Sequence, residues 1–228
     1  MLEMHIYETA SWWITAFANW HEDHYQQQFF ALIEKYHDRI LFEVTGHDHL
    51  AGLRTHKVTE SGSDAQYLNK VLFPSITANS DTNPGFGTFE YDTETQVVSK
   101  LQFTYVDVDG TIGMPAETPF EELPWMNVDF ETKFGLMDLS GESIRSLTDR
   151  LMGDPEKARE FEFNRMGVDT SNERQVHDGL KAFKSTGLIG KTRTAKNAFL
   201  RAEDFAITAC VMTESMYVQE LTDCAERA

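Results

Sequence analysis

The chain of 228 residues is long enough for one large domain or two small ones, and its 41% hydrophobic and 12% aromatic content suits a packed core rather than disorder. A formal net charge of −17 argues against nucleic acid as a partner, because phosphate binding needs clustered lysine and arginine, and it does not favour binding to anionic membranes. No apolar run reaches the roughly 18 residues that a transmembrane helix needs, and the N-terminus lacks the pattern of a signal peptide.

The first regular element that the sequence predicts is a helix over residues 20–38. Apolar residues recur there at three- and four-residue steps, and Asn19 is suited to be the N-cap. His21 and His24 lie three positions apart in this segment, a spacing that could hold a metal ion. We expect them instead to be exposed polar residues of the first turn.

A strand and a histidine pair follow this helix. The run Ile40–Thr45 is rich in β-branched and aromatic residues, which predicts a buried strand, and Gly46 permits a sharp turn at its end. His47 and His49 then occupy alternate positions. Imidazoles one residue apart on a loop that a strand positions can reach two neighbouring metal ions, and histidine is a common ligand of zinc and iron. Two solvated loop histidines remain the other interpretation.

Short apolar runs with turn residues between them predict further strands at 50–58, 70–76, 87–91 and 97–106. The turn at Asn83–Gly85 has either a structural role or a place in the lining of a substrate cleft. The segment Asp107–Gly110 begins like a calcium-binding loop, but the remaining positions of that motif are missing. We therefore expect it to be a turn.

Beyond an irregular linker at 114–125 the pattern becomes helical. Capping residues, proline and glycine place helices at 141–152 and 155–166, and periodicity alone places two more at 170–184 and about 195–222. The segment Gly187–Thr192 is similar to a phosphate-binding loop, but Ser185 occupies the leading glycine position and no strand precedes it. Cys210 and Cys224 are the two cysteines, and whether they form a disulfide stays open.

These elements together predict an α+β fold. We expect a mainly antiparallel sheet from residues 40–106, the helix of residues 20–38 packed on it, and a helical region after it. The predicted domains are residues 1–112 and residues 113–228.

The block Gly46-His47-x-His49 after a strand, together with the run Asn69–Asp92, resembles the calcineurin-like metallophosphoesterases, and within them the acid sphingomyelinase-like phosphodiesterases. The resemblance extends from about His5 to Asp92, with a weaker similarity up to about residue 167. It is a resemblance to the C-terminal portion of that family. It implies the C-terminal half of the family's β-sandwich and a metal-dependent hydrolase of phosphodiesters.

The resemblance also implies a set of metal ligands. His47 and His49 correspond to the histidines that bind the two ions of the family's dinuclear site. His5 corresponds to a strand-end histidine that joins His47, although Tyr7 stands where the family's motif continues with proline. The implied cofactor is a divalent metal, zinc by the family's habit. The implied substrate is a phosphodiester such as a phospholipid or a nucleotide.

Three other blocks of the family are absent from the chain: Asp-x-His, Gly-Asp-x-x-Asp and Gly-Asn-His-Asp/Glu. They supply the bridging aspartate, further ligands and the acid that protonates the leaving group. We therefore expect a C-terminal fragment that holds at most one ion weakly and needs an N-terminal half for catalysis. The alternative is a non-catalytic remnant that binds a partner or a lipid surface. The family is mostly secreted or lysosomal, so the missing signal peptide fits a fragment.

Overall fold

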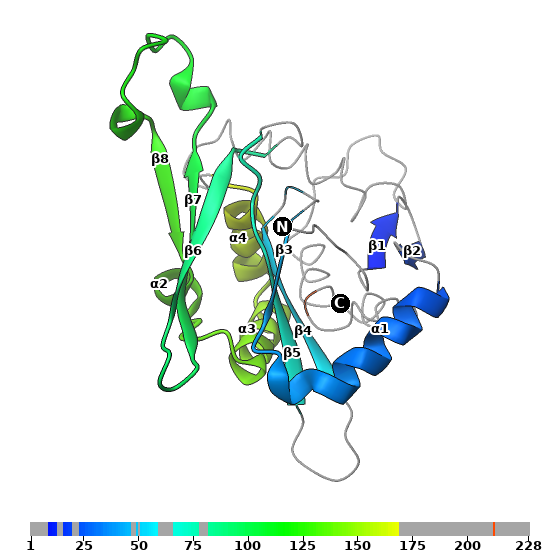
Figure 1. Cartoon of the computed structure of the whole chain (residues 1–228). Coiled ribbons are helices and arrows are strands. Elements are labelled where there is room, and N and C mark those ends of the chain that lie inside the picture. The colour runs from blue at the N-terminus through cyan, green and yellow to red at the C-terminus, as the bar shows by residue number, and fades with distance from the viewer. Residues whose placement is uncertain are drawn as a thin grey trace.

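The computed structural model describes residues 9–12, 16–19, 23–46, 49, 51–58, 66–77, 82–168 and 212. The strands are β1 (Thr9–Trp12), β2 (Ala16–Asn19), β3 (Glu43–Thr45), β4 (Gly52–Val58), β5 (Gln66–Leu72), β6 (Gly85–Tyr91), β7 (Val98–Val106) and β8 (Trp125–Asp129) (Figure 1). The helices are α1 (Asp23–Tyr36), α2 (Phe130–Phe134), α3 (Gly141–Gly153) and α4 (Pro155–Arg165), with 3-10 turns η1 (His37–Arg39), η2 (Asp109–Thr111) and η3 (Phe120–Glu122). The helices expected at 170–184 and 195–222, the segment 187–192 and both cysteines lie outside the described residues, apart from Met212.

The α+β class is confirmed, but the strands of residues 40–106 do not form one sheet. β3, β5 and β4 form one sheet in that order, with β3 parallel and β4 antiparallel to β5. β6, β7 and β8 form a separate antiparallel sheet, and β1 pairs with β2. The expectation of a single sheet was therefore wrong, because the turn at 82–84 starts a new antiparallel meander instead of returning the chain to β5.

Helices cover both faces of the β3–β5–β4 sheet. Leu53 and Val71 lie side by side across β4 and β5 and belong to the main hydrophobic core, on the face that α3 contacts. On the opposite face, Val58 and Leu68 pack against Ile33 of α1 in a smaller cluster. Because side chains alternate along a strand, Arg54, His56 and Lys70 lie on the same face of the sheet as Val58 and Leu68.

The main core is aromatic where the second sheet meets the helices. Phe103 of β7, Phe130 of α2 and Phe161 of α4 are buried, and their rings form edge-to-face contacts at centroid distances of 5.0 Å and 5.9 Å. Burying one such side chain contributes about 1.5–3 kcal/mol. This packing holds α2 and α4 on the inner face of the β6–β7–β8 sheet.

Two of the predicted helices begin at the expected caps. The Ser140 side chain accepts a hydrogen bond from the Ser143 amide at the start of α3, and Asp154 accepts one from the Lys157 amide at the start of α4. α4 stops before Gly167, whose φ is +70°. These helices are confirmed. In the part of the chain that the structure describes, no helix has the length and apolar character that crossing a membrane requires.

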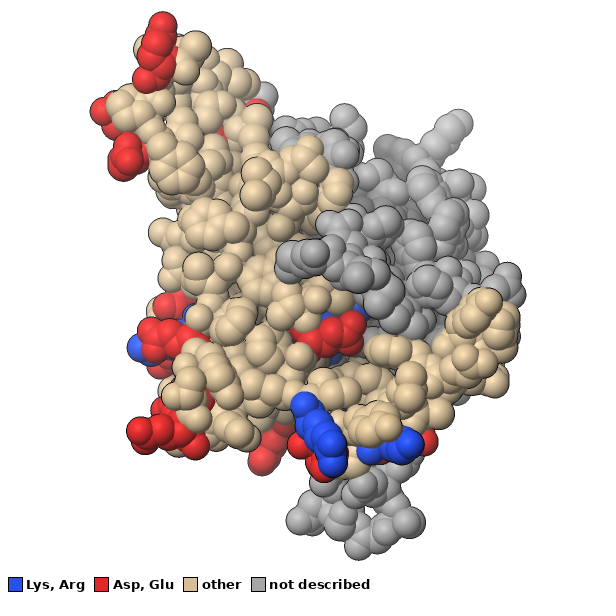
Figure 2. Space-filling model, viewed as in Figure 1, with Lys and Arg blue, Asp and Glu red and all other residues tan. Residues whose placement is uncertain are grey.

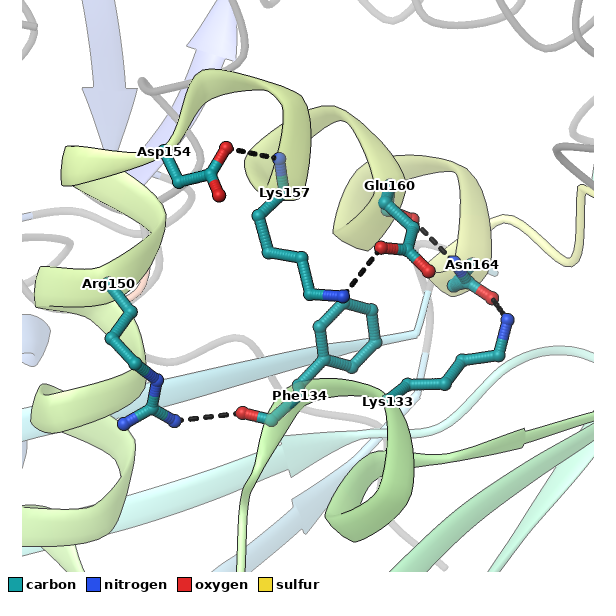
Figure 3. A network of polar contacts seen from close by, with 7 residues as sticks. All are labelled: Lys133, Phe134, Arg150, Asp154, Lys157, Glu160 and Asn164. Carbon is teal, nitrogen blue, oxygen red and sulfur yellow. Dashed lines mark hydrogen bonds and ion pairs between the residues drawn. The ribbon is translucent and has the colours of Figure 1, made fainter.

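Polar contacts join α2, α3 and α4 at their ends (Figure 3). The Arg150 guanidinium of α3 donates to the Phe134 carbonyl at 2.8 Å, and Lys133 donates to the Asn164 side chain of α4 at 3.0 Å. Lys157 bonds to Glu160 at 2.7 Å within α4. The three helices are therefore held by directional bonds as well as by the aromatic core.

The connection between β7 and β8 contains the region expected to be an irregular linker. It includes η2 and η3 and leads directly into β8, a strand that the sequence did not predict. Between Asp107 and Pro124 it carries five acidic residues and no lysine or arginine, and Figure 2 shows red and no blue at this projecting end. The boundary expected after residue 112 falls inside this connection, between two paired strands that share one core.

Candidate functional site

The loop that carries two of the three predicted metal ligands, His47 and His49, joins β3 to β4 at the end of the sheet where β5 ends. Thr45 at the end of β3 and Gly52 at the start of β4 both pair with Leu72, the last residue of β5. Both ends of the loop between them therefore lie at the carboxyl end of β5. The Phe73 amide donates to the Thr45 carbonyl at 2.9 Å, which fixes the N-terminal side of the loop.

His49 lies on this loop and is half-buried, with a φ of +63°. The left-handed region costs a residue with a side chain about 1–2 kcal/mol, and histidine occupies it more often than most residues. Such a backbone persists when the surroundings hold it, and it is common at functional sites. We refer to residues 46–51 as the histidine loop.

Of the three predicted ligands, His49 is the one in the described residues; His5 and His47 lie outside them. The convergence of the three imidazoles therefore stays a prediction. Among the residues that the structure describes, no three His, Cys, Asp or Glu side chains lie close enough to hold a metal ion. His24 is exposed in the first turn of α1, as expected, and His21 is not described.

The C-terminal side of the histidine loop is bound by a helix that sequence reasoning did not connect with it. The Arg165 guanidinium of α4 donates to the Ala51 carbonyl at 2.9 Å and to the Glu162 carboxylate at 2.7 Å. The side chains of Arg165 and Glu162 are 8% and 0% exposed. A Glu and an Arg three residues apart in a helix are typical of a surface pair, so no sequence signal distinguishes this role.

A second group that the sequence did not single out consists of basic side chains inside the β3–β5–β4 sheet. Lys70 of β5 pairs across the sheet with Arg54 of β4 and Glu43 of β3, and His56 follows Arg54 on the same face. Arg54, His56 and Lys70 are 8%, 1% and 0% exposed. Burial holds the pKa of His56 well below its usual value, and the charges of Lys70 and Arg54 lower it further. His56 is therefore neutral in the folded chain.

This burial predicts a pH-dependent stability. The unfolded chain takes up a proton on His56 near pH 6.5 while the folded chain does not, so protonation favours unfolding. The contribution of His56 to stability is complete above about pH 6.5 and falls below it, by at most about 1.4 kcal/mol per pH unit. Urea unfolding from pH 7.5 to pH 5 should show this slope. His56→Gln should flatten it and His24→Gln should not; equal slopes in both variants would contradict the assignment.

The turn around Asn83 shows structural contacts. Its side chain donates to the Gly167 carbonyl at 2.7 Å and accepts from the Val108 amide at 3.2 Å. The Gly85 amide donates to the Ser75 carbonyl at 2.8 Å. Of the two interpretations of this turn, these contacts support the structural one. The segment 107–110 is a turn, as expected, with the Thr111 amide bonded to the Val108 carbonyl.

No family model matches the sequence, and no curated protein matches it. The resemblance to the sphingomyelinase-like phosphodiesterases therefore stays a prediction from the motifs of the sequence.

The described part of the site offers one imidazole, that of His49, on the loop between β3 and β4. A neutral imidazole is a ligand that zinc accepts, and the half-burial of His49 leaves part of this residue to solvent. His49 therefore fits a divalent metal by donor type and position.

Proposed function

We propose that this chain is the C-terminal part of a metal-dependent phosphodiester hydrolase of the sphingomyelinase-like type. In this proposal its sheets are the C-terminal half of a metallophosphoesterase β-sandwich, and His5, His47 and His49 are its contribution to a dinuclear metal site. The observation that carries the proposal is the position of His49, on a loop whose two ends lie at the carboxyl end of β5, next to the parallel strand β3. Ligands of sheets with parallel strands commonly bind at such carboxyl ends.

The proposed cofactor is a divalent metal, with zinc the first candidate because all three ligands are imidazoles. When bound, the metal supplies Lewis-acid chemistry and activates water toward a phosphodiester. The role of this chain is to hold its imidazoles at fixed positions. Three neutral ligands leave the charge of two dications largely uncompensated, so the chain alone holds at most one ion, weakly.

The proposed substrate is a phosphodiester, a phospholipid or a nucleotide, and the proposed compartment is secreted or lysosomal. The remaining ligands and the acid for the leaving group come from an N-terminal half, which is the partner that the proposal needs. Loss of a general acid alone lowers a rate by about 10²- to 10⁴-fold. The isolated chain should therefore turn over a phosphodiester poorly, even with added zinc.

The test is zinc titration calorimetry together with turnover of bis(4-nitrophenyl) phosphate. We expect one weak zinc site in the native chain, loss of that site in His47→Ala and His49→Ala, and retention in His24→Ala, which removes an exposed histidine of α1. Turnover should stay near background. Unchanged zinc affinity in His49→Ala would contradict the proposal and favour the non-catalytic binding module. Strong turnover that both loop variants abolish would contradict the expected inactivity.

A further inference from the structure

The two ends of the histidine loop are held by different parts of the fold. The bond from the Phe73 amide to the Thr45 carbonyl belongs to the β3–β5–β4 sheet itself. The bond from Arg165 to the Ala51 carbonyl comes from α4, 114 residues further along the chain. Ala51 is fully buried, so this carbonyl depends on a protein donor rather than on solvent.

Arg165 is itself fixed by its surroundings. Its Nε donates to Glu162, its NH1 lies against Gly52 at the start of β4, and its own carbonyl accepts the hydroxyl of Tyr105 at 2.8 Å. The planar guanidinium donates in two directions at once, which an ammonium group on a flexible stem does not reproduce. In a buried site such charge-assisted bonds are stronger than in water.

We propose that Arg165 is a positioning residue for the metal site, an inference that rests on the proposed function. Arg165 holds the Ala51 carbonyl, and Ala51 follows His49 by two residues in the histidine loop. His49 has a left-handed backbone that its surroundings must maintain. Without the bond to Ala51, His49 relaxes toward other backbone conformations and its imidazole leaves the position required of a ligand.

In this proposal the helical part of the chain supports the metal site through α4. The resemblance to the phosphodiesterases is clearest from about His5 to Asp92, whereas Glu162 and Arg165 of α4 lie in the part, up to about residue 167, where the similarity is weaker. The bond to Ala51 makes α4 part of the support of the histidine loop and not only a cover for the sheet. Metal binding should therefore depend on α4 although α4 contributes no ligand.

The first test measures the loop without any metal. Arg165→Met removes the bond to the Ala51 carbonyl, so the backbone around it should open more easily. Amide hydrogen exchange at His49 and Ala51 should then be about fivefold or more faster, the opening free energy being lowered by about one hydrogen bond. Arg165→Lys should restore the charge but not the slow exchange. The matched control is Arg150→Met, which removes another helix arginine that donates to a backbone carbonyl, that of Phe134 at the end of α2. In the control, exchange at His49 and Ala51 should not change.

Arg165→Met leaves a buried Glu162, so the double variant E162L/R165M is measured in parallel to keep the chain folded. Urea unfolding gives the free energy of unfolding of each variant, and from it the exchange rate that global unfolding alone would cause. That rate is subtracted from the measured exchange rate. Fast exchange at Ala51 in Arg165→Met and in E162L/R165M supports the inference. Exchange equal to that of the native chain and of Arg150→Met would overturn it.

The second test adds zinc. Loss of a residue that orients a ligand lowers metal affinity by about 10- to 100-fold. We expect this loss in E162L/R165M and native affinity in Arg150→Met. If the native chain binds no zinc, the proposed function fails while the exchange result still decides whether Arg165 positions the loop. If the native chain and E162L/R165M bind zinc equally, the proposed function stands and this inference fails.

Discussion

Glu162→Ala should destabilise the folded chain by about 3–5 kcal/mol, because it leaves the guanidinium of Arg165 buried without its carboxylate. The two groups lie 2.7 Å apart with 0% and 8% of their side chains exposed. Removal of one partner from such a pair costs far more than the pair's net contribution to stability, since the remaining charge loses its compensation and cannot reach water. Urea unfolding at pH 7.5 measures the change.

The double variant E162L/R165M separates the charge from the packing. Because it removes both buried charges and keeps an apolar side chain at each position, it should cost much less than the sum of the single variants. The control on the same helix is Glu156→Ala, which breaks the more exposed pair with Arg159 at 3.5 Å. That change should cost less than about 1 kcal/mol. A Glu162→Ala effect as small as this would show that the buried pair is not a structural anchor.

The elements that the sequence predicted correctly are those with local signals. α3 and α4 start at Ser140 and Asp154 because a side-chain oxygen satisfies an amide that the helix leaves unpaired, and this chemistry is visible in four or five residues of sequence. β7 follows from a run of β-branched and aromatic residues at its C-terminal half. Such signals need no knowledge of the rest of the fold.

The elements that the sequence did not reveal depend on distant contacts. β8 has five residues and is a strand because β7 pairs with it, and α2 is a short helix held by the burial of Phe130 and Phe134. The division of the strands into two sheets depends on pairing between residues that are far apart in sequence. Propensity is too weak to decide such cases, since tertiary packing overrides it.

The same distinction applies to the candidate site. The sequence placed His49 correctly on a loop after a strand, because a glycine and a change of pattern mark that point. It could not show that Arg165 reaches Ala51 or that His56 is buried. Polar residues at alternate positions of β4 are typical of a strand with one solvent face, and only the packing of the whole chain buries Arg54 and His56.

Gly167→Ala should destabilise the folded chain by about 2–5 kcal/mol, through two independent effects. Gly167 has a φ of +70°, a conformation that costs a residue with a side chain about 1–2 kcal/mol. A Cβ at this position would also lie 2.5 Å from Cδ1 of Tyr105, and overpacking of this kind costs about 1–3 kcal/mol. Urea unfolding gives the sum of the two.

The Tyr105 ring cannot move aside to relieve this overlap. It is fully buried, its hydroxyl donates to the Arg165 carbonyl, and on another side it contacts Gly85, where a Cβ would also lie 2.5 Å from Cδ1. Gly113→Ala is the matched control, because Gly113 has a φ of +87° and open space around its Cα. It should cost only the backbone part, about 1–2 kcal/mol. Equal losses in the two variants would show that Tyr105 yields, whereas a larger loss for Gly167→Ala locates the extra cost in the contact between β7 and the end of α4.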